Sequence, residues 1–233
     1  IPVKLGPRTT VYDLAFEGAR ALSEKALAEA SGLTLGDALS TLKLEDARRK
    51  ILEAYKEEGY TYADLRYTVE QSQDRTRARI RFVISEGEQV IVRRIVIRGN
   101  NFTNTWAIER RVALMVGKPY RASAVRNTQE RIATLNTFSS VSVDLEDPSL
   151  PQRNKVVIVT VIERPRQYTE IAPGFSTGEG ARIAFEYGHR NLFGNGVSFT
   201  FRVQFAYLPT ILIIDDTARE NYKPLDPFAR LGS

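Results

Sequence analysis

Few residues in this chain of 233 are of the types that perform catalysis or bind metals. It has one histidine, His189, and no cysteine, so disulfides, thiolate zinc sites and cysteine nucleophiles are excluded. A single histidine cannot form a histidine metal cluster, and we expect His189 to hold a turn through hydrogen bonds. Glu57 and Glu58 are adjacent, and adjacent helical positions diverge, so this pair predicts a solvated face rather than acid/base chemistry.

Two glycine-containing segments and one tryptophan are the remaining candidates. Gly178-Glu179-Gly180 and Gly194-Asn195-Gly196 lack the strand-to-helix context that a phosphate-binding loop needs. Trp106 starts a predicted helix near Phe102, so we expect it in a core or at a contact between domains. None of these residues forms a group that could catalyse a reaction. We therefore expect a protein that is not an enzyme, has no cofactor or metal, and works through its backbone geometry.

The composition is typical of a folded protein. Hydrophobic residues make up 42% and charged residues 26%, which is far from a disordered tract. The net charge of +5 comes from basic residues that usually lie near acidic ones, as in Glu45-Asp46-Ala47-Arg48, so we expect solvated faces and no nucleic-acid site. No apolar run reaches the roughly 20 residues of a transmembrane helix. Ile1-Pro2-Val3-Lys4 lacks a signal-peptide pattern, which predicts a mature or truncated start.

The first two thirds of the chain contain a duplicated unit. Shifting the sequence by 81 positions superimposes apolar residues and glycines, namely Gly6 on Gly87, Val11 on Val92, Leu14 on Ile95, Phe16 on Ile97, Gly18 on Gly99 and Gly36 on Gly117. Matches of this kind at one offset indicate a structural repeat. We expect the two copies to be separate domains joined by a short link at residues 86–90.

Each copy has the pattern of strand, helix, helix, strand and strand. In the first copy the first strand covers residues 11–16 and the first helix residues 19–30. The second helix carries Ala47, Ile51, Ala54 and Tyr55 on one face, and the last two strands cover residues 65–69 and 80–84. In the second copy the same elements cover residues 92–97, a helix capped by Asn104 or Thr105 and carrying Ile108, Val112 and Met115, a helix from Ser123, then 141–145 and 157–161. The pattern predicts a three-stranded sheet with its third strand in the middle, covered on one face by two helices.

Several short motifs mark the ends of strands and helices in the repeat. They are the glycine after the first strand, the turn Gly36-Asp37-Ala38-Leu39-Ser40, the helix end Tyr55-Lys56-Glu57-Glu58-Gly59-Tyr60 and the strand end Ile84-Ser85-Glu86-Gly87. Together they resemble the polypeptide-transport-associated (POTRA) domain, and this resemblance implies one domain at residues 9–87 and another at 88–166. Residues 1–8 look like the end of a preceding domain.

The last third of the sequence changes to long two-residue alternation. After a turn at Leu192 to Gly196, every odd position from Val197 to Tyr207 is apolar, and the even positions are mostly polar. Ala181 to Tyr187 alternate in the same way. Strands of about 9 to 11 residues with one apolar face suit a position between lipid and a wet lumen. A strand of a soluble sandwich is the alternative that alternation alone leaves open.

The segment Glu186-Tyr187-Gly188-His189-Arg190-Asn191-Leu192-Phe193-Gly194-Asn195-Gly196 resembles the first barrel hairpins of the outer-membrane assembly superfamily that includes BamA and TamA. The resemblance implies an α+β fold class overall, with tandem βααββ POTRA domains followed by the first antiparallel strands of a transmembrane β-barrel at residues 167–233. Leu208 to Ser233 would be a surface loop. A TamA-like protein is favoured, with POTRA domains in the periplasm and the barrel in the outer membrane.

The resemblance also implies a function and partners. Unfolded outer-membrane proteins or autotransporters would add a strand to the edges of the POTRA sheets. They would then enter the membrane at a seam of the barrel near Tyr168 to Thr177, because Pro173 and Gly174 in this segment are typical of an edge strand. A bend into the barrel is the alternative reading of that segment. Outer-membrane lipid and periplasmic accessory proteins are further partners. A two-partner secretion transporter, or a structural interaction protein with POTRA domains, remains the alternative function.

Three groups of site residues are predicted. The client-binding edges are the second strands of the repeats, represented by Tyr62, Asp64, Leu65, Tyr67, Val69, Val141, Ser142, Val143, Asp144 and Leu145. The barrel turn motif comprises His189, Arg190, Asn191, Leu192, Phe193, Gly194 and Gly196. The residues predicted to face lipid are Ile183, Phe185, Tyr187, Phe199, Phe201, Val203 and Phe205.

Overall fold

The computed structural model describes residues 9–176 and 180–207. The chain divides into two compact units, with the boundary between Arg164 and Pro165. The first unit contains both sequence repeats and the second contains the strands of the last third. The predicted end of a preceding domain at residues 1–8, the predicted surface loop at 208–233 and Thr177 lie outside the described residues.

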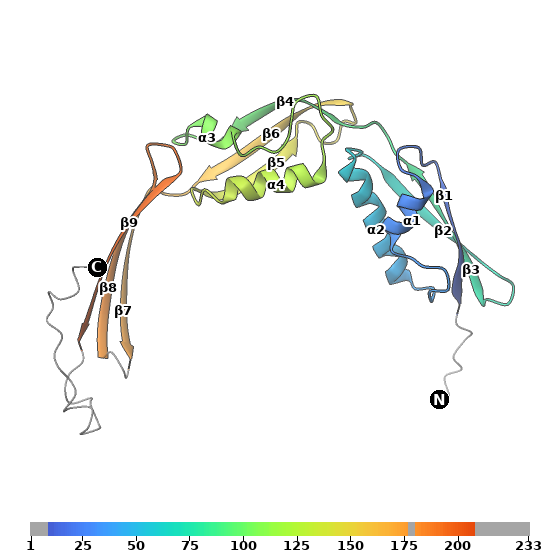
Figure 1. Cartoon of the computed structure of the whole chain (residues 1–233), viewed down its shortest axis with the longest axis horizontal. Helices are drawn as coiled ribbons and strands as arrows, with labels where there is room; N and C mark the ends of the chain where they lie inside the picture. The colour runs from blue at the N-terminus through green and yellow to red at the C-terminus, as the bar shows by residue number, and fades with distance from the viewer. Residues whose placement is uncertain (1–8, 177–179, 208–233) are drawn as a thin grey trace, which may run out of the picture. The chain divides into compact units, whose positions relative to one another are not determined.

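The first repeat folds as one sheet with two helices. Its elements are β1 (Thr10–Glu17), α1 (Glu24–Ser31), α2 (Thr41–Glu57), β2 (Asp64–Gln71) and β3 (Arg77–Ser85) (Figure 1). The strand order is β1-β3-β2, with β1 parallel and β2 antiparallel to the central β3. Leu65, Tyr67 and Val69 lie opposite Ile84, Phe82 and Ile80. The predicted order and the predicted pairing of the last two strands are confirmed.

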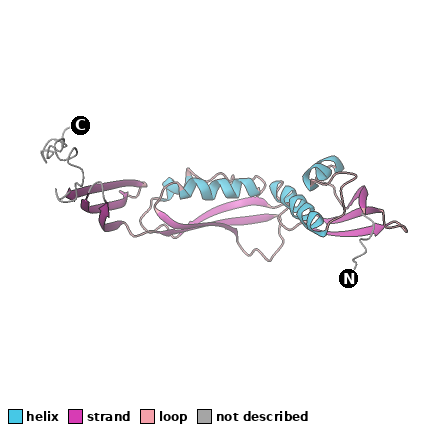
Figure 2. Cartoon of the chain, turned by 90° about the horizontal axis from the view of Figure 1, so that it is seen from below, coloured by secondary structure: helices cyan, strands magenta, loops and turns pink. Residues whose placement is uncertain are grey.

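The second repeat has the same topology. Its elements are β4 (Ile91–Arg98), α3 (Thr105–Glu109), α4 (Ala122–Ala133), β5 (Phe138–Leu145) and β6 (Asn154–Glu163), in the strand order β4-β6-β5. Val141, Val143 and Leu145 lie opposite Val161, Val159 and Val157, as predicted. Figure 2 shows a helix lying along one face of this sheet. Each repeat has its own cluster of buried apolar residues between sheet and helices.

The first helix of each repeat is shorter than predicted. α1 begins at Glu24 rather than near Ala19, because the side chain of Ser23 accepts a hydrogen bond from the Ala26 amide and caps the helix there. α3 ends at Glu109, so Val112 and Met115 are not part of it. The amide of nearby Ala113 donates to the hydroxyl of Thr128 in α4 (2.9 Å) instead of continuing a helical ladder.

The helix α2 agrees better with its prediction. Its buried side chains are Leu44, Ala47, Ile51 and Tyr55, and Asp46 pairs with Lys50 at 2.9 Å on the solvent side. α4 begins at Ala122, one residue before the predicted Ser123.

A glycine follows the first strand of each repeat because backbone from the third strand approaches it closely. Gly18 and Gly99 have positive φ angles of 84° and 88°. A Cβ atom would lie 2.2 Å from the carbonyl oxygen of Ile84 at Gly18, and 1.9 Å from that of Val161 at Gly99. Any side chain at either position would therefore clash with the central strand.

A carboxylate at the end of the third strand fastens the segment after this glycine. Glu86 accepts hydrogen bonds from the amides of Arg20 (2.7 Å) and Ala21 (2.8 Å) and from the hydroxyl of Tyr55 (2.9 Å). Glu163 accepts from the amides of Phe102 (3.0 Å) and Thr103 (2.7 Å) in the second repeat. The central strand thus holds the entry to the first helix in both copies.

These contacts change the ionisation of the groups involved. Burial raises the pKa of Glu86, but the amides of Arg20 and Ala21 and the Tyr55 hydroxyl outweigh it, so the pKa lies below its usual value. Burial, followed by the hydrogen bond to Glu86, raises the pKa of the Tyr55 hydroxyl.

The second unit is a three-stranded antiparallel sheet. Its strands are β7 (Gln167–Ser176), β8 (Gly180–Leu192) and β9 (Val197–Tyr207), in the order β7-β8-β9. β7 pairs with β8 along its whole length and is an edge strand of the described sheet, which is where Pro173 is tolerated. Leu192, predicted to begin the turn, still belongs to β8.

We predict that Gly99→Ala destabilises the second repeat much more than Gly117→Ala. Both glycines have positive φ, so both substitutions cost about 1 kcal/mol of backbone strain. Only at Gly99 would the new methyl group also meet a carbonyl oxygen, which raises the expected loss to roughly 3 kcal/mol or more. Chemical denaturation of residues 9–164 measures both free energies of unfolding. Equal losses would contradict the close approach.

We also predict a pH-dependent effect of Glu86→Gln. The folded-state pKa is depressed, so the stabilisation is present above the unfolded-state value of 4.5 and is lost as the pH falls through the folded-state pKa. The variant should lose about 1 kcal/mol of unfolding free energy at pH 7, and less below pH 4.5. Glu88→Gln, at an exposed position, is the control. A difference that does not shrink in acid would refute this role of the carboxylate.

Candidate functional site

The strand order leaves two kinds of sheet edge in each repeat. The outer side of β1 is partly paired, because the Val11 amide donates to the Asp37 carbonyl (2.8 Å) and the Gly36 amide donates to the Val11 carbonyl (2.7 Å). β4 is covered in the same way, because the Val92 amide donates to the Lys118 carbonyl (2.9 Å) and the Gly117 amide donates to the Val92 carbonyl (2.8 Å). The second strands, β2 and β5, are therefore the more open edges in the described repeats.

The backbone of β2 and β5 shows which groups point outward. The amide of Ser72 donates to the carbonyl of Arg77 (2.9 Å), and the amide of Glu146 donates to the carbonyl of Val156 (2.9 Å). Ser72 and Glu146 therefore continue the hydrogen-bond ladders to the central strands. In an antiparallel pair the inward and outward groups alternate along the strand. The odd-numbered residues Leu65, Tyr67, Val69, Val141, Val143 and Leu145 consequently direct their amides and carbonyls outward.

The side chains of these outward-directed residues face mainly toward the helices. Leu65, Val143 and Leu145 are buried, whereas Tyr67, Val69 and Val141 are half-buried. Asp64 and Asp144 are exposed and Ser142 is half-buried on the other face of the sheets. The predicted edge residues thus offer mainly backbone groups, which suits a site that discriminates little between side chains.

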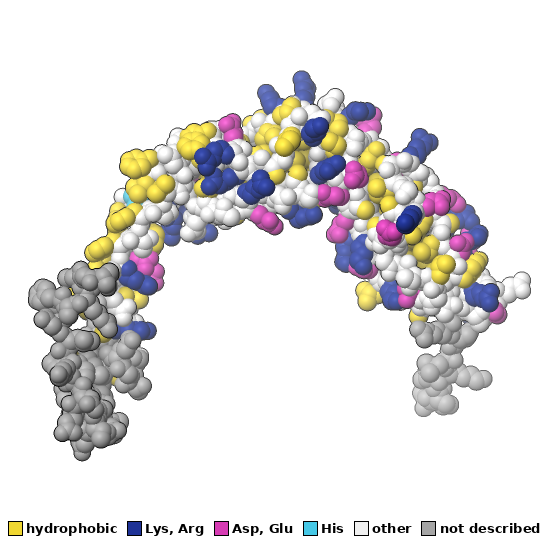
Figure 3. All heavy atoms as spheres, viewed as in Figure 1, with side chains coloured by type: hydrophobic (Ala, Val, Ile, Leu, Met, Phe, Trp, Pro, Cys, Tyr) yellow, Lys and Arg dark blue, Asp and Glu magenta, His cyan; other side chains and the backbone are white. Residues whose placement is uncertain are grey.

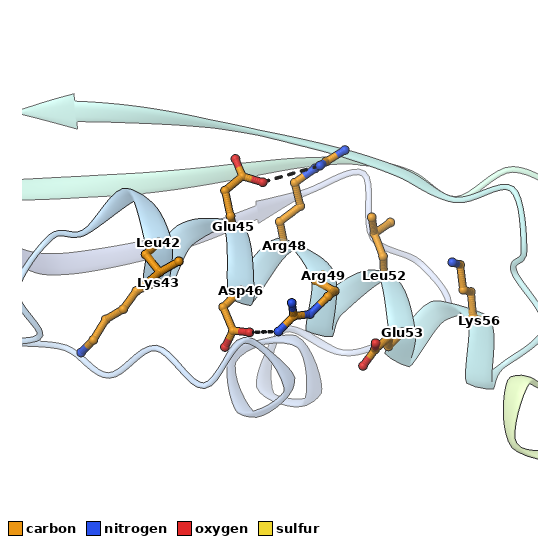
Figure 4. Close-up of a pocket in the computed structure, with 9 residues that line it drawn as sticks. All are labelled: Leu42, Lys43, Glu45, Asp46, Arg48, Arg49, Leu52, Glu53 and Lys56. Atoms are coloured by element: carbon orange, nitrogen blue, oxygen red, sulfur yellow. Dashed lines mark hydrogen bonds and ion pairs between the residues drawn. The ribbon is translucent and has the colours of Figure 1, made fainter.

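Side chains already donate to outward carbonyls on both edges. The guanidinium Nε of Arg48, from α2, donates to the Leu65 carbonyl at 2.8 Å, and the Tyr120 hydroxyl donates to the Val143 carbonyl at 3.3 Å. Arg48 also lies 3.7 Å from Glu45 (Figure 4) and its side chain is 40% exposed. A strand added at either edge would have to displace or avoid these side chains. The sequence prediction missed both partners, because nothing in the repeat pattern identifies them.

Tyr62 is not an edge residue. It precedes β2, which begins at Asp64, and its ring packs against the core of the second repeat. Its hydroxyl donates to the Leu150 carbonyl at 3.1 Å. The predicted strand started too early because aromatic residues at 60 and 62 imitate strand alternation, whereas Tyr62 in fact joins the two repeats.

A carboxylate of the first repeat caps a helix of the second. Glu57, in the last turn of α2, accepts from the amide of Ser123 at 2.9 Å and also from its hydroxyl. α4 has no acidic residue in its own first turn and no capping side chain at Arg121. Glu57 therefore supplies the negative charge that a helix N-terminus favours. The prediction of a purely solvated face is wrong for Glu57.

The link between the repeats is fastened by further contacts. The Val90 amide donates to the Gly59 carbonyl (2.9 Å), and the Gln89 side chain donates to the Glu58 carbonyl (2.8 Å). Gly59 lies close to Pro119, where a Cβ atom would come within 2.9 Å of the proline Cβ. The expected short link at residues 86–90 thus has specific contacts on both sides.

In the second unit, the predicted lipid-facing residues share one face of the sheet. Ile183 lies opposite Phe205, Phe185 opposite Val203 and Tyr187 opposite Phe201. Directly opposed residues point to the same side of a sheet. Phe199 continues this face opposite His189, and Ile171 and Phe175 extend it on β7. Hydrophobic side chains gather along one side of this unit in Figure 3.

The other face carries a polar cluster. Glu186 accepts a hydrogen bond from the Tyr168 hydroxyl (2.9 Å) and pairs with Arg202 (3.1 Å). The Tyr168 ring covers Gly188, where a Cβ atom would come within 2.0 Å of the ring, and the Arg190 guanidinium lies 4.1 Å from the ring centroid. These contacts join β7 to β8 on the face that opposes the apolar one.

The turn motif is closed by Asn191, not by His189. The Asn191 side-chain oxygen accepts from the Gly196 amide at 2.8 Å, and Asn191, Phe193 and Gly194 adopt positive φ angles. Within the described residues, Nδ1 of His189 is buried without a hydrogen-bond partner. The expectation that His189 holds the turn was wrong because its alternating position aligns it with the apolar face, opposite Phe199.

Other candidate features carry no chemistry of their own. Trp106 is 46% exposed and is therefore not part of a core, whereas a contact between domains, the other alternative, stays a prediction. A shallow depression on the outer side of α2 is lined mainly by charged side chains that pair with each other, such as Asp46 and Arg49 (Figure 4). In the part of the chain that the structure describes, no group of three or more His, Asp or Glu side chains could hold a metal ion. In the same residues, no helix has the length and apolar content needed to cross a membrane.

Comparison with known proteins also identifies two repeats. The family model described as "POTRA: Surface antigen variable number repeat" matches residues 9–87 and 90–164. The chain is 23% identical over 208 residues to the outer membrane protein assembly factor BamA of Nitratidesulfovibrio vulgaris, covering 83% of this chain and 25% of that protein. It is 27% identical over 147 residues to BamA of Neisseria meningitidis serogroup B, covering 62% of this chain and 18% of that protein. The chain therefore spans a quarter or less of these relatives.

Solved structures share the fold. BamA from Haemophilus ducreyi lacking POTRA domains 1–3 superimposes with a TM-score of 0.69 at 17% identity, covering 85% of this chain and 37% of that chain. A structure of POTRA domains 3–5 of Haemophilus influenzae BamA gives a TM-score of 0.54 at 18% identity, covering 68% of this chain and 62% of that chain. At these identities the likeness concerns the fold.

We predict that Glu57→Ala loosens the contact between the repeats. Loss of the cap at α4 should cost about 1 kcal/mol of unfolding free energy and speed amide hydrogen exchange at Ser123. Glu53→Ala, one turn earlier at an exposed position of α2, is the control and should change stability by less than about 0.5 kcal/mol. Unchanged exchange at Ser123 in the Glu57 variant would show that the cap does not hold α4.

Proposed function

Because the chain belongs to the POTRA family, with copies at residues 9–87 and 90–164, we propose that its repeats bind extended segments of unfolded outer-membrane proteins by strand addition. The observation that carries the proposal is the pair of open edges on β2 and β5, where alternate residues direct both backbone groups outward. Such an edge accepts an extended segment through main-chain hydrogen bonds.

The energetics suit transient handling of many partners. A main-chain hydrogen bond contributes only about 0.5 to 1.5 kcal/mol net, so a short added strand binds weakly and can be released. The buried side chains of Leu65, Val143 and Leu145 leave few selective contacts at the edge. Binding is therefore tolerant of sequence. No catalytic step is required, and the proposed role is binding rather than turnover.

The second unit supports the membrane part of the proposal. Its apolar face on β8 and β9 would meet lipid, and its polar face with Glu186 and Arg202 would meet a wet interior. We place the repeats in the periplasm and this sheet in the outer membrane. Clients would enter the membrane beside the free side of β7. The relatives found are named BamA, so β-barrel clients in general are proposed here, and a TamA-like role with autotransporters stays a prediction.

Photo-crosslinking in the full-length protein tests the β5 edge and the seam at β7. Probes at Ser142 and Asp144 in β5, and at Ile171 in β7, should capture unfolded outer-membrane clients during assembly, because these side chains lie beside the proposed pairing sites. A probe at Arg131 on the outer side of α4 is the control. Capture at Arg131 with none at Ser142 and Asp144 would refute strand addition. Capture at β5 alone would refute only the seam.

A substitution pair tests the lipid-facing assignment. Phe201→Arg should cost about 2 to 4 kcal/mol in the membrane-inserted full-length protein if it lies near the bilayer centre, whereas Thr200→Arg on the opposite face should cost much less. Unfolding from lipid vesicles in urea measures both. Equal or reversed losses would show that the apolar face packs against protein instead of lipid.

A further inference from the structure

The second repeat exposes an aromatic and basic surface on its short first helix. Trp106 is 46% exposed, although large aromatic residues are usually buried. The Arg110 guanidinium lies 4.9 Å from the centroid of the Trp106 ring. In Figure 3, hydrophobic and basic side chains lie side by side in the region of α3. We call Trp106 and Arg110 the aromatic patch.

The first repeat provides an internal comparison. Ser23 caps α1 and Asn104 precedes α3 at the same position, and the buried Leu27 and Ile108 match at the same spacing from these residues. Counting from the caps, Trp106 corresponds to Lys25 and Arg110 to Glu29. The first repeat therefore has an ordinary charged surface where the second has the aromatic patch. The repeat fold itself does not require the patch.

Chain connectivity keeps the patch near the start of the second unit. The Glu163 carboxylate accepts the amide of Phe102, and β7 begins four residues after Glu163. Four residues span at most roughly 14 Å, whatever the arrangement of the units. If β7 enters the outer membrane, as proposed above, the patch is tethered close to the bilayer surface. The first repeat has no such tether.

We infer that the aromatic patch binds the phospholipid surface of the outer membrane on its periplasmic side. Tryptophan with its amphipathic ring is enriched at the level of lipid headgroups, and arginine pairs with their phosphates. Arg110 beside Trp106 combines both preferences on one exposed surface. The contact would fix the second repeat against the membrane. This inference rests on the proposed membrane location of the second unit.

The test uses residues 9–164, which have their own apolar cores and end at the unit boundary. The POTRA domains of the Haemophilus influenzae relative were likewise solved without a barrel. Trp106 is the single tryptophan of the chain, so its fluorescence reports this surface alone. A histidine tag after Arg164 holds the protein on vesicles of phosphatidylethanolamine, phosphatidylglycerol and nickel-chelating lipid, which replaces the tether of β7. Brominated acyl chains then quench a tryptophan that enters the bilayer surface.

We expect Trp106 to shift its emission to the blue and to lose most of its fluorescence on brominated vesicles. The matched control carries Trp106→Lys and Lys25→Trp, which moves the single tryptophan to the equivalent position of the first repeat, and it should keep its fluorescence. Arg110→Glu should reduce the quenching. Folded protein without quenching, or equal quenching of the control, would overturn the inference. No client is present, so this result is independent of the crosslinking test of strand addition.

Discussion

The close contact between the first and third strands of each repeat determines the rest of the structure. Gly18 and Gly99 follow the first strands and lie so close to a carbonyl oxygen of the central strand that there is no room for a side chain. The carboxylates of Glu86 and Glu163 then hold the following segment. These contacts fix the third strand beside the first, so that the second strand must pair on its remaining side.

The same constraint creates the proposed binding edges. Because β3 and β6 occupy the centre, β2 and β5 are left with one unpaired side. Loops that follow the first helix cover the opposite edges at Val11 and Val92. Arg48 and Tyr120 occupy one carbonyl each on the open edges. Strand addition there exchanges a side-chain hydrogen bond for a main-chain one, which keeps the gain in free energy modest.

The sequence predicts the periodic features of the fold well. Apolar alternation at Leu65 to Val69 and at Val141 to Leu145 predicted strands with the observed register, because the buried face allows only one. The contacts made by single polar groups were not predictable. Glu57 capping a helix 66 residues later, Tyr62 joining the repeats and Asn191 closing the turn depend on three-dimensional proximity that no periodicity encodes. One available signal was the absence of acidic residues in the first turn of α4.

Backbone hydrogen exchange of residues 9–164 with a client peptide tests the central claim most directly. Addition of a peptide from the terminal strand of an outer-membrane β-barrel should slow exchange at the outward amides of Val141, Val143 and Leu145. The amides of Ser142 and Asp144, which already bond to β6, should change little. This alternation is the signature of an added strand. Protection confined to α4, or equal protection along β5 without alternation, would contradict binding of clients at the sheet edge.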